Sequence, residues 1–129
     1  MDSAIPVLVV EDEALILAVL EDALVEAGFT ISKASRGEEA IEMLEAKNIP
    51  FRALITDVNL GSHVTGWDVA RHARLITPEL PVIYTTATPH DWEAMGVPNS
   101  IFIVKPYVPM QILTAVSQLL NAATPPAVT

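Results

Sequence analysis

The chain of 129 residues contains no cysteine. A disulfide framework and any thiolate metal site are therefore excluded, and nothing in the sequence points to an oxidising compartment. Basic residues are also scarce, since 7 lysines and arginines stand against 16 aspartates and glutamates, for a formal net charge of −9. This charge balance argues against nucleic-acid binding by this chain.

Long hydrophobic runs are missing as well, although hydrophobic residues make up 51% of the chain. No uninterrupted apolar stretch approaches the roughly 20 residues that a membrane-spanning helix needs. Asp2 stands near the N-terminus, where a secretory signal would carry basic residues. We therefore expect a cytoplasmic protein without a membrane span, built as one domain that is long enough for a sound core.

Five short runs rich in apolar and β-branched residues predict strands, and stretches of helical periodicity alternate with them. The strands are expected at residues 5–10, 29–34, 53–57, 81–85 and 101–104. Helices are expected from residue 14 to a stop at Gly28, from a capping box at 35–38, at 65–75, at 91–95 and from about 109 to 121.

The expected strands are apolar nearly throughout instead of alternating with polar residues. This pattern is typical of a parallel sheet that helices cover on both faces. The sequence therefore predicts an α/β fold with a doubly wound, five-stranded parallel sheet over residues 1–121. Residues 122–129, with two adjacent prolines, are expected to form a flexible C-terminal tail or a truncated linker.

Polar side chains stand where four of the five expected strands end. Glu11 and Asp12 follow the first strand, Asp57 ends the third, Thr86 follows the fourth and Lys105 the fifth. Because the carboxyl ends of parallel strands lie along one edge, these side chains should converge. Clustered carboxylates without histidine or cysteine favour Mg²⁺. A lysine and a hydroxyl beside them suit transfer of a phosphoryl group to an aspartate oxygen.

Four segments surround these strand ends: Val-Leu-Val-Val-Glu-Asp-Glu at 7–13, Leu-Ile-Thr-Asp at 54–57, Val-Ile-Tyr-Thr-Thr-Ala at 82–87 and Val-Lys-Pro-Tyr at 104–107. They resemble the receiver domains of two-component response regulators, and the chain looks like a single-domain, chemotaxis-regulator-like member. The resemblance spans about residues 5–121 and implies the flavodoxin-like (βα)5 receiver fold. It further implies Mg²⁺ as cofactor, with Mn²⁺ as a substitute, and a histidine kinase or histidine phosphotransfer protein as phosphodonor. Such a chain is a phosphoacceptor signalling domain that catalyses only its own phosphorylation and dephosphorylation.

The same resemblance assigns the roles in phosphorylation. Asp57 would accept the phosphoryl group, and Lys105 would pair first with Asp57 and then with that group. Thr86 would donate a hydroxyl hydrogen bond to the phosphoryl group. The side-chain rotamer of Phe102 would change together with this new contact. The bond between Lys105 and Pro106 is expected to be cis. The plainer interpretations are an ordinary ion pair for Lys105, a loop cap for Thr86 and a static core position for Phe102.

The metal ligands implied by the resemblance are the side chains of Asp12 and Asp57 and the main-chain carbonyl of Asn59. Glu11 would take part through water or more loosely. The alternative for Glu11 and Asp12 is that they only cap the first helix.

Two departures from the usual receiver pattern concern loops. Residues 59–66 lack the common Met-Pro turn and look about one residue longer, and the segment between Thr86 and Lys105 is short. We therefore expect a stunted or partly unwound fourth helix at 91–95, and hypothesise a different dimer or partner surface there. A homodimer is left open by the apolar composition.

The first helix begins with seven apolar residues, so that one stripe faces the sheet and Leu15, Ile16 and Val19 are candidates for exposure. Exposed apolar side chains often mark protein interfaces. We predict that the phosphodonor docks at Leu15 and Ile16. The alternative is that the last helix or a dimer partner buries them.

Three other functions compete with a phosphorylated signalling module. A Mg²⁺-dependent phosphatase of the aspartyl-phosphate kind would need a second aspartate at position 59, where Asn59 cannot shuttle a proton. A flavodoxin-like nucleotide binder would need a phosphate loop after the first strand, where Glu11 and Asp12 would repel phosphate. The main rival is a degenerate receiver that serves as a phosphorylation-independent protein-binding scaffold.

Overall fold

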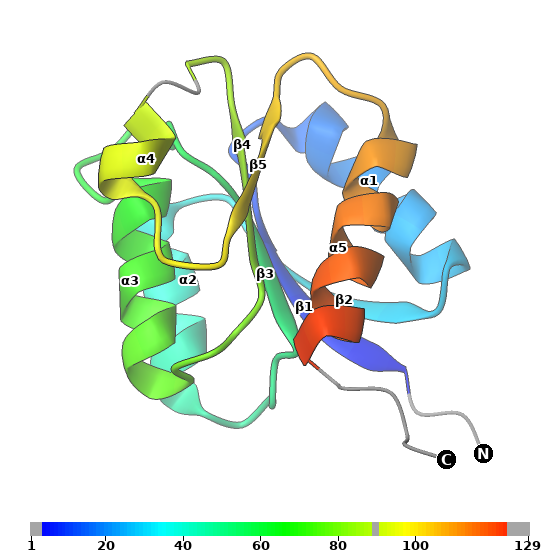
Figure 1. The fold of residues 1–129 in the computed structure, drawn as a ribbon, viewed down its shortest axis with the longest axis horizontal. Helices are drawn as coiled ribbons and strands as arrows, with labels where there is room; N and C mark the ends of the chain where they lie inside the picture. Colours follow the sequence, from blue (N-terminus) through cyan, green and yellow to red (C-terminus); the bar gives the residue numbers. More distant parts are fainter. Residues whose placement is uncertain (1–3, 89–90, 124–129) are drawn as a thin grey trace.

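The computed structural model describes residues 4–88 and 91–123. Strands and helices alternate along these residues, and the five strands form one parallel sheet in the order β2-β1-β3-β4-β5. Helices α1 and α5 lie on one face of the sheet and α2, α3 and α4 on the other (Figure 1). The predicted doubly wound α/β fold is confirmed. The elements are β1 (Ile5–Val10), α1 (Ala14–Glu26), β2 (Phe29–Ala34), α2 (Gly37–Ala46), β3 (Ala53–Asp57), α3 (Gly66–Ile76), β4 (Val82–Thr86), α4 (Trp92–Met95), β5 (Ile101–Val104) and α5 (Pro109–Ala123).

The sheet separates two hydrophobic cores, because successive side chains of a strand point to opposite faces. Val9 and Ile55 belong to the core under α1 and α5, whereas Leu8 and Leu54 belong to the core under α2 and α3. All four side chains are buried, so both faces of the central strands β1 and β3 need apolar residues. The double burial explains why these strands lack polar alternation.

Helix α3 begins as its sequence predicts, and α2 does not. The Thr65 side chain accepts the N–H of Asp68 at 3.2 Å, and the Asp68 carboxylate accepts the N–H of Thr65 at 2.9 Å. The capping box expected at 35–38 is wrong, because the chain is extended at Arg36 and the helix begins at Gly37. Glu39, one residue later than expected, accepts the N–H of Ser35 at 2.9 Å.

The last third of the chain shows the expected short fourth helix. Helix α4 has only four residues, Trp92–Met95, and the bond between Lys105 and Pro106 is cis. Helix α5 continues to Ala123, so the expected boundary at residue 121 lies within a helix, and the rest of the expected tail, 124–129, is outside the described residues. In the described part of the chain, none of the helices combines the length and apolar character needed to cross a bilayer.

Candidate functional site

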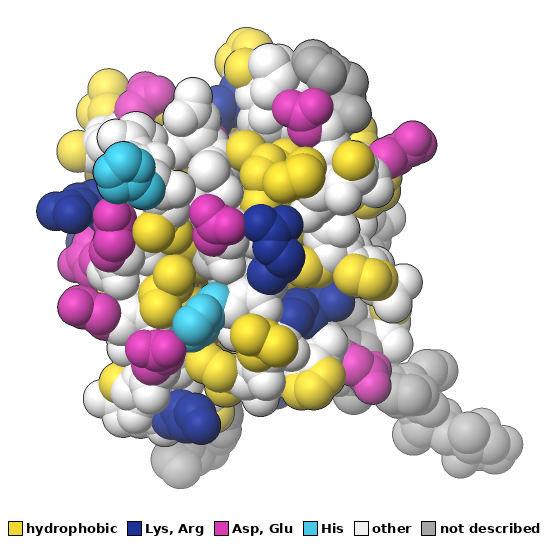
Figure 2. All heavy atoms as spheres, turned by 90° about the vertical axis from the view of Figure 1, so that its left-hand side faces the viewer, with side chains coloured by type: hydrophobic (Ala, Val, Ile, Leu, Met, Phe, Trp, Pro, Cys, Tyr) yellow, Lys and Arg dark blue, Asp and Glu magenta, His cyan; other side chains and the backbone are white. Residues whose placement is uncertain are grey.

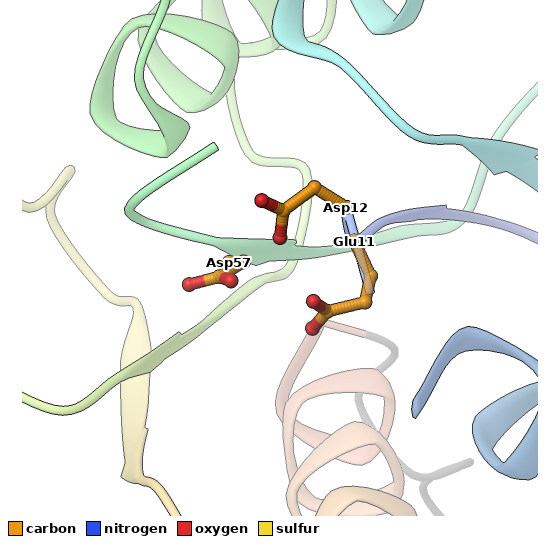
Figure 3. Close-up of side chains that lie close together, drawn as sticks. All are labelled: Glu11, Asp12 and Asp57. Atoms are coloured by element: carbon orange, nitrogen blue, oxygen red, sulfur yellow. The ribbon is translucent and has the colours of Figure 1, made fainter. Parts of the chain in front are cut away.

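Three carboxylates meet at the carboxyl edge of the sheet. Strands β1 and β3 are neighbours, with Val10 opposite Thr56, so the residues that follow β1 lie beside the end of β3. Glu11, Asp12 and Asp57 each offer an oxygen, and these oxygens all lie within 4.8 Å of one another. Figure 3 shows Asp12 and Glu11 reaching toward Asp57 from the end of β1. The parallel sheet thus assembles the acidic cluster that the sequence predicts.

The three acids differ in their exposure to solvent. Asp57 and Glu11 are buried, with 5% and 2% of their surface exposed, whereas Asp12 is exposed. The N–H of Asn59 donates to Asp57 Oδ1 at 3.3 Å, and the N–H of Glu13 donates to Glu11 Oε2 at 3.1 Å. These main-chain donors fix the two buried carboxylates, while Asp12 leaves the cluster open to solvent.

Lys105 supplies the positive charge of the site. Its Nζ lies 2.8 Å from Asp57 Oδ2 and 3.5 Å from Glu11 Oε1. The main-chain N–H of Lys105 donates to the carbonyl of Thr86 at 2.9 Å, which continues the pairing of β4 with β5 up to the site. The lysine therefore bridges both buried carboxylates from the far side of β4.

The ionisation of these groups reflects burial and their mutual charges. Burial and the charge of Asp57 raise the pKa of Glu11 to about 7, although the N–H of Glu13 and the charge of Lys105 oppose the shift. Burial also raises the pKa of Asp57, with Lys105 acting in the opposite direction. Burial disfavours the charged Lys105, but the hydrogen bond and charge of Asp57 outweigh burial and raise its pKa. Lys105 therefore keeps its positive charge, while the raised pKa values of Glu11 and Asp57 disfavour the ionised forms of these two carboxyl groups.

Thr86 and Phe102 lie on neighbouring strands beside the cluster. Thr86 is buried at the end of β4, and its Oγ1 accepts the N–H of Thr88 at 3.0 Å. Phe102 is partly buried in β5, with its ring centroid 4.9 Å from that of Trp92 in α4. The hydroxyl lies near the acidic edge, while the aromatic side chain faces the short helix.

One further residue shapes the site and escaped the sequence reasoning. Gly66 begins α3 directly against β3, and a Cβ at this position would collide with the main-chain oxygen of Asp57. The glycine that follows a capping threonine was visible in the sequence, but its closeness to Asp57 depends on tertiary packing.

An apolar groove of about 600 Å³ opens beside the acidic cluster, between α1 and the connection from β5 to α5. Leu15 is 80% exposed there and Val19 is also exposed. Ile16 differs from the expectation of free exposure, because it packs partly into the core under α1 and α5. The groove is lined by Leu15, Ile16, Val19, Leu20, Ala87, Lys105, Pro106, Tyr107 and Pro109.

The donor set of the cluster fits a hard divalent cation. It offers carboxylate oxygens from three residues and no nitrogen or sulfur ligand, which is the set that Mg²⁺ and Mn²⁺ accept. Asp12 is accessible from solvent, so an ion has an approach to the two buried carboxylates. The residues present therefore suit a metal site at this edge.

A parallel five-stranded sheet with an acidic cluster and a lysine at its carboxyl edge is the architecture of a two-component receiver domain. The response regulator receiver domain family matches residues 7–117, and the chain belongs to this family. The acidic cluster of Glu11, Asp12 and Asp57 is typical of the family's phosphorylation site.

Individual relatives agree with this membership. The phyllosphere-induced regulator PhyR of Methylorubrum extorquens is 33% identical over 92% of this chain and 45% of PhyR. The chemotaxis protein CheY of Thermotoga maritima is 26% identical over 88% of this chain and 95% of CheY. A receiver protein structure from Sinorhizobium medicae is 40% identical, with a TM-score of 0.89 over 93% of this chain and 97% of the other. The chain thus spans less than half of PhyR and nearly all of the other two.

Proposed function

We propose that this chain accepts a phosphoryl group on Asp57 from a histidine kinase or a histidine phosphotransfer protein, in a Mg²⁺-dependent reaction. The observation that carries the proposal is the contact of Lys105 Nζ with Asp57 Oδ2 at 2.8 Å inside the acidic cluster. The buried carboxylate is thereby oriented, with one oxygen held by Lys105 and the other by the N–H of Asn59. On this proposal the chain is a cytoplasmic signalling domain that catalyses only its own phosphorylation and dephosphorylation.

The chemistry follows from the positions of these groups. An oxygen of Asp57 forms the new P–O bond while the P–N bond to the donor histidine breaks, and the electron pair of that bond stays with the imidazole. Asp12, Asp57 and the carbonyl of Asn59 would hold Mg²⁺, with Glu11 in a looser role. The bound ion would neutralise negative charge on the phosphoryl oxygens. Lys105 is placed to move from Asp57 to a phosphoryl oxygen.

The output of the domain would be a change in protein binding. Thr86 would donate its hydroxyl to the new phosphoryl group, which would draw the end of β4 toward Asp57. Phe102 would respond on β5, where it contacts Trp92 of α4. The signal would thus reach a downstream protein through the surface around α4 and β5.

Intact-mass spectrometry after incubation with acetyl phosphate and Mg²⁺ tests the acceptor assignment. We expect wild type to gain the mass of one phosphoryl group, and Asp57→Asn to gain none because its amide oxygen is a poor nucleophile. Asp22→Asn, at an exposed position of α1, is the matched control and should label like wild type. Removing Mg²⁺ with a chelator should abolish labelling.

The alternative is a degenerate receiver that binds a protein partner without phosphorylation. Absence of any mass gain with acetyl phosphate, followed by absence of transfer from the cognate phosphodonor, would support this scaffold. Labelling that persists in Asp57→Asn would show instead that another residue is the acceptor.

The phosphodonor is proposed to dock in the apolar groove that Leu15 lines, because Lys105 lines the same groove and also contacts Asp57. Leu15→Asp should slow transfer from the cognate phosphodonor by at least about tenfold, since a carboxylate replaces buried apolar contact area. Labelling by acetyl phosphate should stay unchanged. Leu75→Asp, at an 81% exposed position of α3, is the control. Equal transfer rates for Leu15→Asp and wild type would remove the groove from the proposal.

A further inference from the structure

A groove of about 540 Å³ lies between α3 and the connection from α4 to β5, here called the arginine groove. Helix α3 contributes Arg71, Arg74 and Leu75, and Pro78 and residues 97–99 complete the lining. The last two segments precede β4 and β5, so the groove lies toward the amino ends of these strands, whereas the acidic cluster lies at the carboxyl edge of the sheet. The proposed phosphorylation chemistry uses no residue of this groove.

The arginine groove is positively charged in a protein that is strongly acidic overall. Its lining includes two arginines and no aspartate or glutamate, although the chain has 16 acidic and only 7 basic residues. Arg71 and Arg74 are one helical turn apart on α3. Figure 2 shows basic side chains bordered by hydrophobic ones on the face that α3 and α4 form. A groove of this kind attracts carboxylate groups, which the net charge of the molecule otherwise repels.

Arg74 is held in place through one nitrogen, which leaves its other donors available. Its Nε donates to the carbonyl of Leu80 at 2.7 Å, and the described residues provide no hydrogen-bond partner for its Nη1 or Nη2. Burial lowers the pKa of Arg74, opposed by the charges of Tyr84 and Glu79, so the guanidinium is partly removed from water. A fixed, partly buried guanidinium with two free nitrogens is suited to bind both oxygens of a carboxylate.

Arg71 adds a second cation, and its present partners are weakly held. Its Nη2 lies 2.9 Å from Asp68 Oδ1, with 47% and 43% of the two side chains exposed. Its Nη1 donates to the carbonyl of Met95 at 3.3 Å. An ion pair this exposed contributes little to stability, so an incoming carboxylate can share Arg71 with Asp68. The two arginines can therefore bind two acidic groups of one ligand.

Leu75 gives the groove an apolar contact next to its positive charge. It is 81% exposed, more than any other large hydrophobic side chain in the part of the chain that the structure describes. Val97 and Pro98 add apolar surface to the same groove. Exposed apolar side chains beside arginines are typical of surfaces that bind another protein. A ligand that matches this surface carries an apolar side chain next to its carboxylates.

We propose that the arginine groove binds a segment of a partner protein in which aspartate or glutamate residues adjoin apolar ones. One carboxylate of the segment pairs with the free nitrogens of Arg74, a second pairs with Arg71, and an apolar side chain packs on Leu75. The net charge of −9 disfavours a nucleic acid as occupant, because its phosphate backbone would be repelled by the rest of the molecule.

This binding is independent of the proposed phosphorylation. The arginine groove and the groove beside Leu15 have no lining residue in common, so a peptide and a phosphodonor occupy separate surfaces. Peptide binding therefore needs neither Asp57 nor Mg²⁺. Failure of one proposal leaves the other standing.

Selection of random peptides displayed on phage tests the proposal without assuming a sequence. Wild type is the bait, and phage that also bind the double variant Arg71→Gln/Arg74→Gln are counted in parallel. We expect enriched peptides to place aspartate or glutamate next to leucine, isoleucine or phenylalanine, and to bind wild type alone. Absence of enrichment, enrichment of basic peptides, or equal binding to the double variant overturns the proposal.

Fluorescence anisotropy with the most enriched peptide locates the contacts. Arg74→Gln should raise the dissociation constant at least about tenfold, because a charge-assisted contact is lost, and NaCl should weaken binding to wild type. Arg74→Lys should recover part of the loss, since lysine keeps the charge without the planar fork. Arg52→Gln, at an exposed arginine outside the groove, is the matched control and should bind like wild type. Equal weakening by Arg52→Gln and Arg74→Gln would show that only net charge matters, and would overturn the assignment to this groove.

A reciprocal pair of leucine variants separates this proposal from phosphodonor docking. Leu75→Asp should weaken peptide binding at least about tenfold and leave phosphotransfer at the wild-type rate. Leu15→Asp makes the same change at an 80% exposed position of α1 and should leave peptide binding unchanged. Equal peptide affinity of Leu75→Asp and wild type would overturn the proposal. NMR shifts at residues 71–78 and 97–99 that change with the concentration of the protein alone would identify a second copy as the occupant, and would overturn it too.

Discussion

Glu11 is the side chain at which burial and charge conflict most strongly. It is 2% exposed and lies beside Asp57, and its pKa is raised to about 7 from an ordinary value near 4.5. The folded state therefore binds more protons than the unfolded chain between about pH 4.5 and 7. The contribution of Glu11 to stability is favourable below this range and is lost as the pH rises through 7.

Replacing this carboxyl by an amide should consequently stabilise the metal-free protein at alkaline pH. Without divalent cations, we expect Glu11→Gln to raise the free energy of unfolding at pH 8 by at least about 1 kcal/mol over wild type. At pH 4, below the ordinary pKa, the difference should nearly vanish, because the wild-type side chain is then mostly protonated in both the folded and the unfolded state. Urea unfolding at both pH values measures this, with Glu42→Gln on the exposed side of α2 as control. A difference independent of pH would contradict the prediction.

The convergence of the polar side chains at the strand ends was predictable, because a parallel sheet places the carboxyl ends of its strands along one edge. Glu11, Asp12, Asp57 and Lys105 meet as the sequence predicts. The near-complete burial of Glu11 was not predictable, because it depends on packing around the site.

At the scale of elements, a polar chain of contacts holds the short α4 in place. Trp92 Nε1 donates to Ser100 Oγ at 3.0 Å, and Ser100 Oγ donates to the carbonyl of Val97 at 2.6 Å. The N–H of Val97 donates to the buried Tyr84 hydroxyl. Four helical residues are too few for autonomous stability, so these tertiary contacts define the segment.

Ser100→Ala should loosen this segment. It leaves the Trp92 indole N–H and the Val97 carbonyl without their partner, and we expect a loss of about 1–2 kcal/mol in unfolding free energy. Amide hydrogen exchange at residues 92–97 should accelerate more than exchange in α3. Ser117→Ala, on the exposed side of α5, should be neutral or slightly stabilising. Unchanged exchange in Ser100→Ala would mean that these hydrogen bonds do not hold α4.

The elements themselves were largely readable from local patterns, and the exceptions have tertiary causes. The start of α3 near residue 65 and the short α4 were predicted correctly. The capping box expected at Ser35 failed, because α2 begins at Gly37, where the helix start packs tightly against Val64 from the loop after β3. A four-residue motif carries no information about such a distant neighbour.

At the scale of the whole molecule, a bound cation should couple to folding. The acidic cluster exists only when β1 and β3 are paired, so an ion that binds it favours the folded state. At ten times its dissociation constant, Mg²⁺ should add about 1.4 kcal/mol to the unfolding free energy. Thermal unfolding with and without Mg²⁺ measures this. Asp12→Asn should lose most of the effect, and an equal Mg²⁺ response in this variant would exclude Asp12 as a ligand.

The contact of Lys105 with Asp57 and Glu11 also fixes the charge that an incoming ion meets. With all three acids ionised, the cluster and the lysine together carry two negative charges, which one divalent cation balances. The resting site is therefore already partly compensated before any ion arrives. A site whose negative charge is partly neutralised binds a divalent cation more weakly, so the ion exchanges with solvent instead of being held permanently. On the proposed function, such exchange would allow the signalling state to follow the supply of phosphoryl groups instead of the supply of metal.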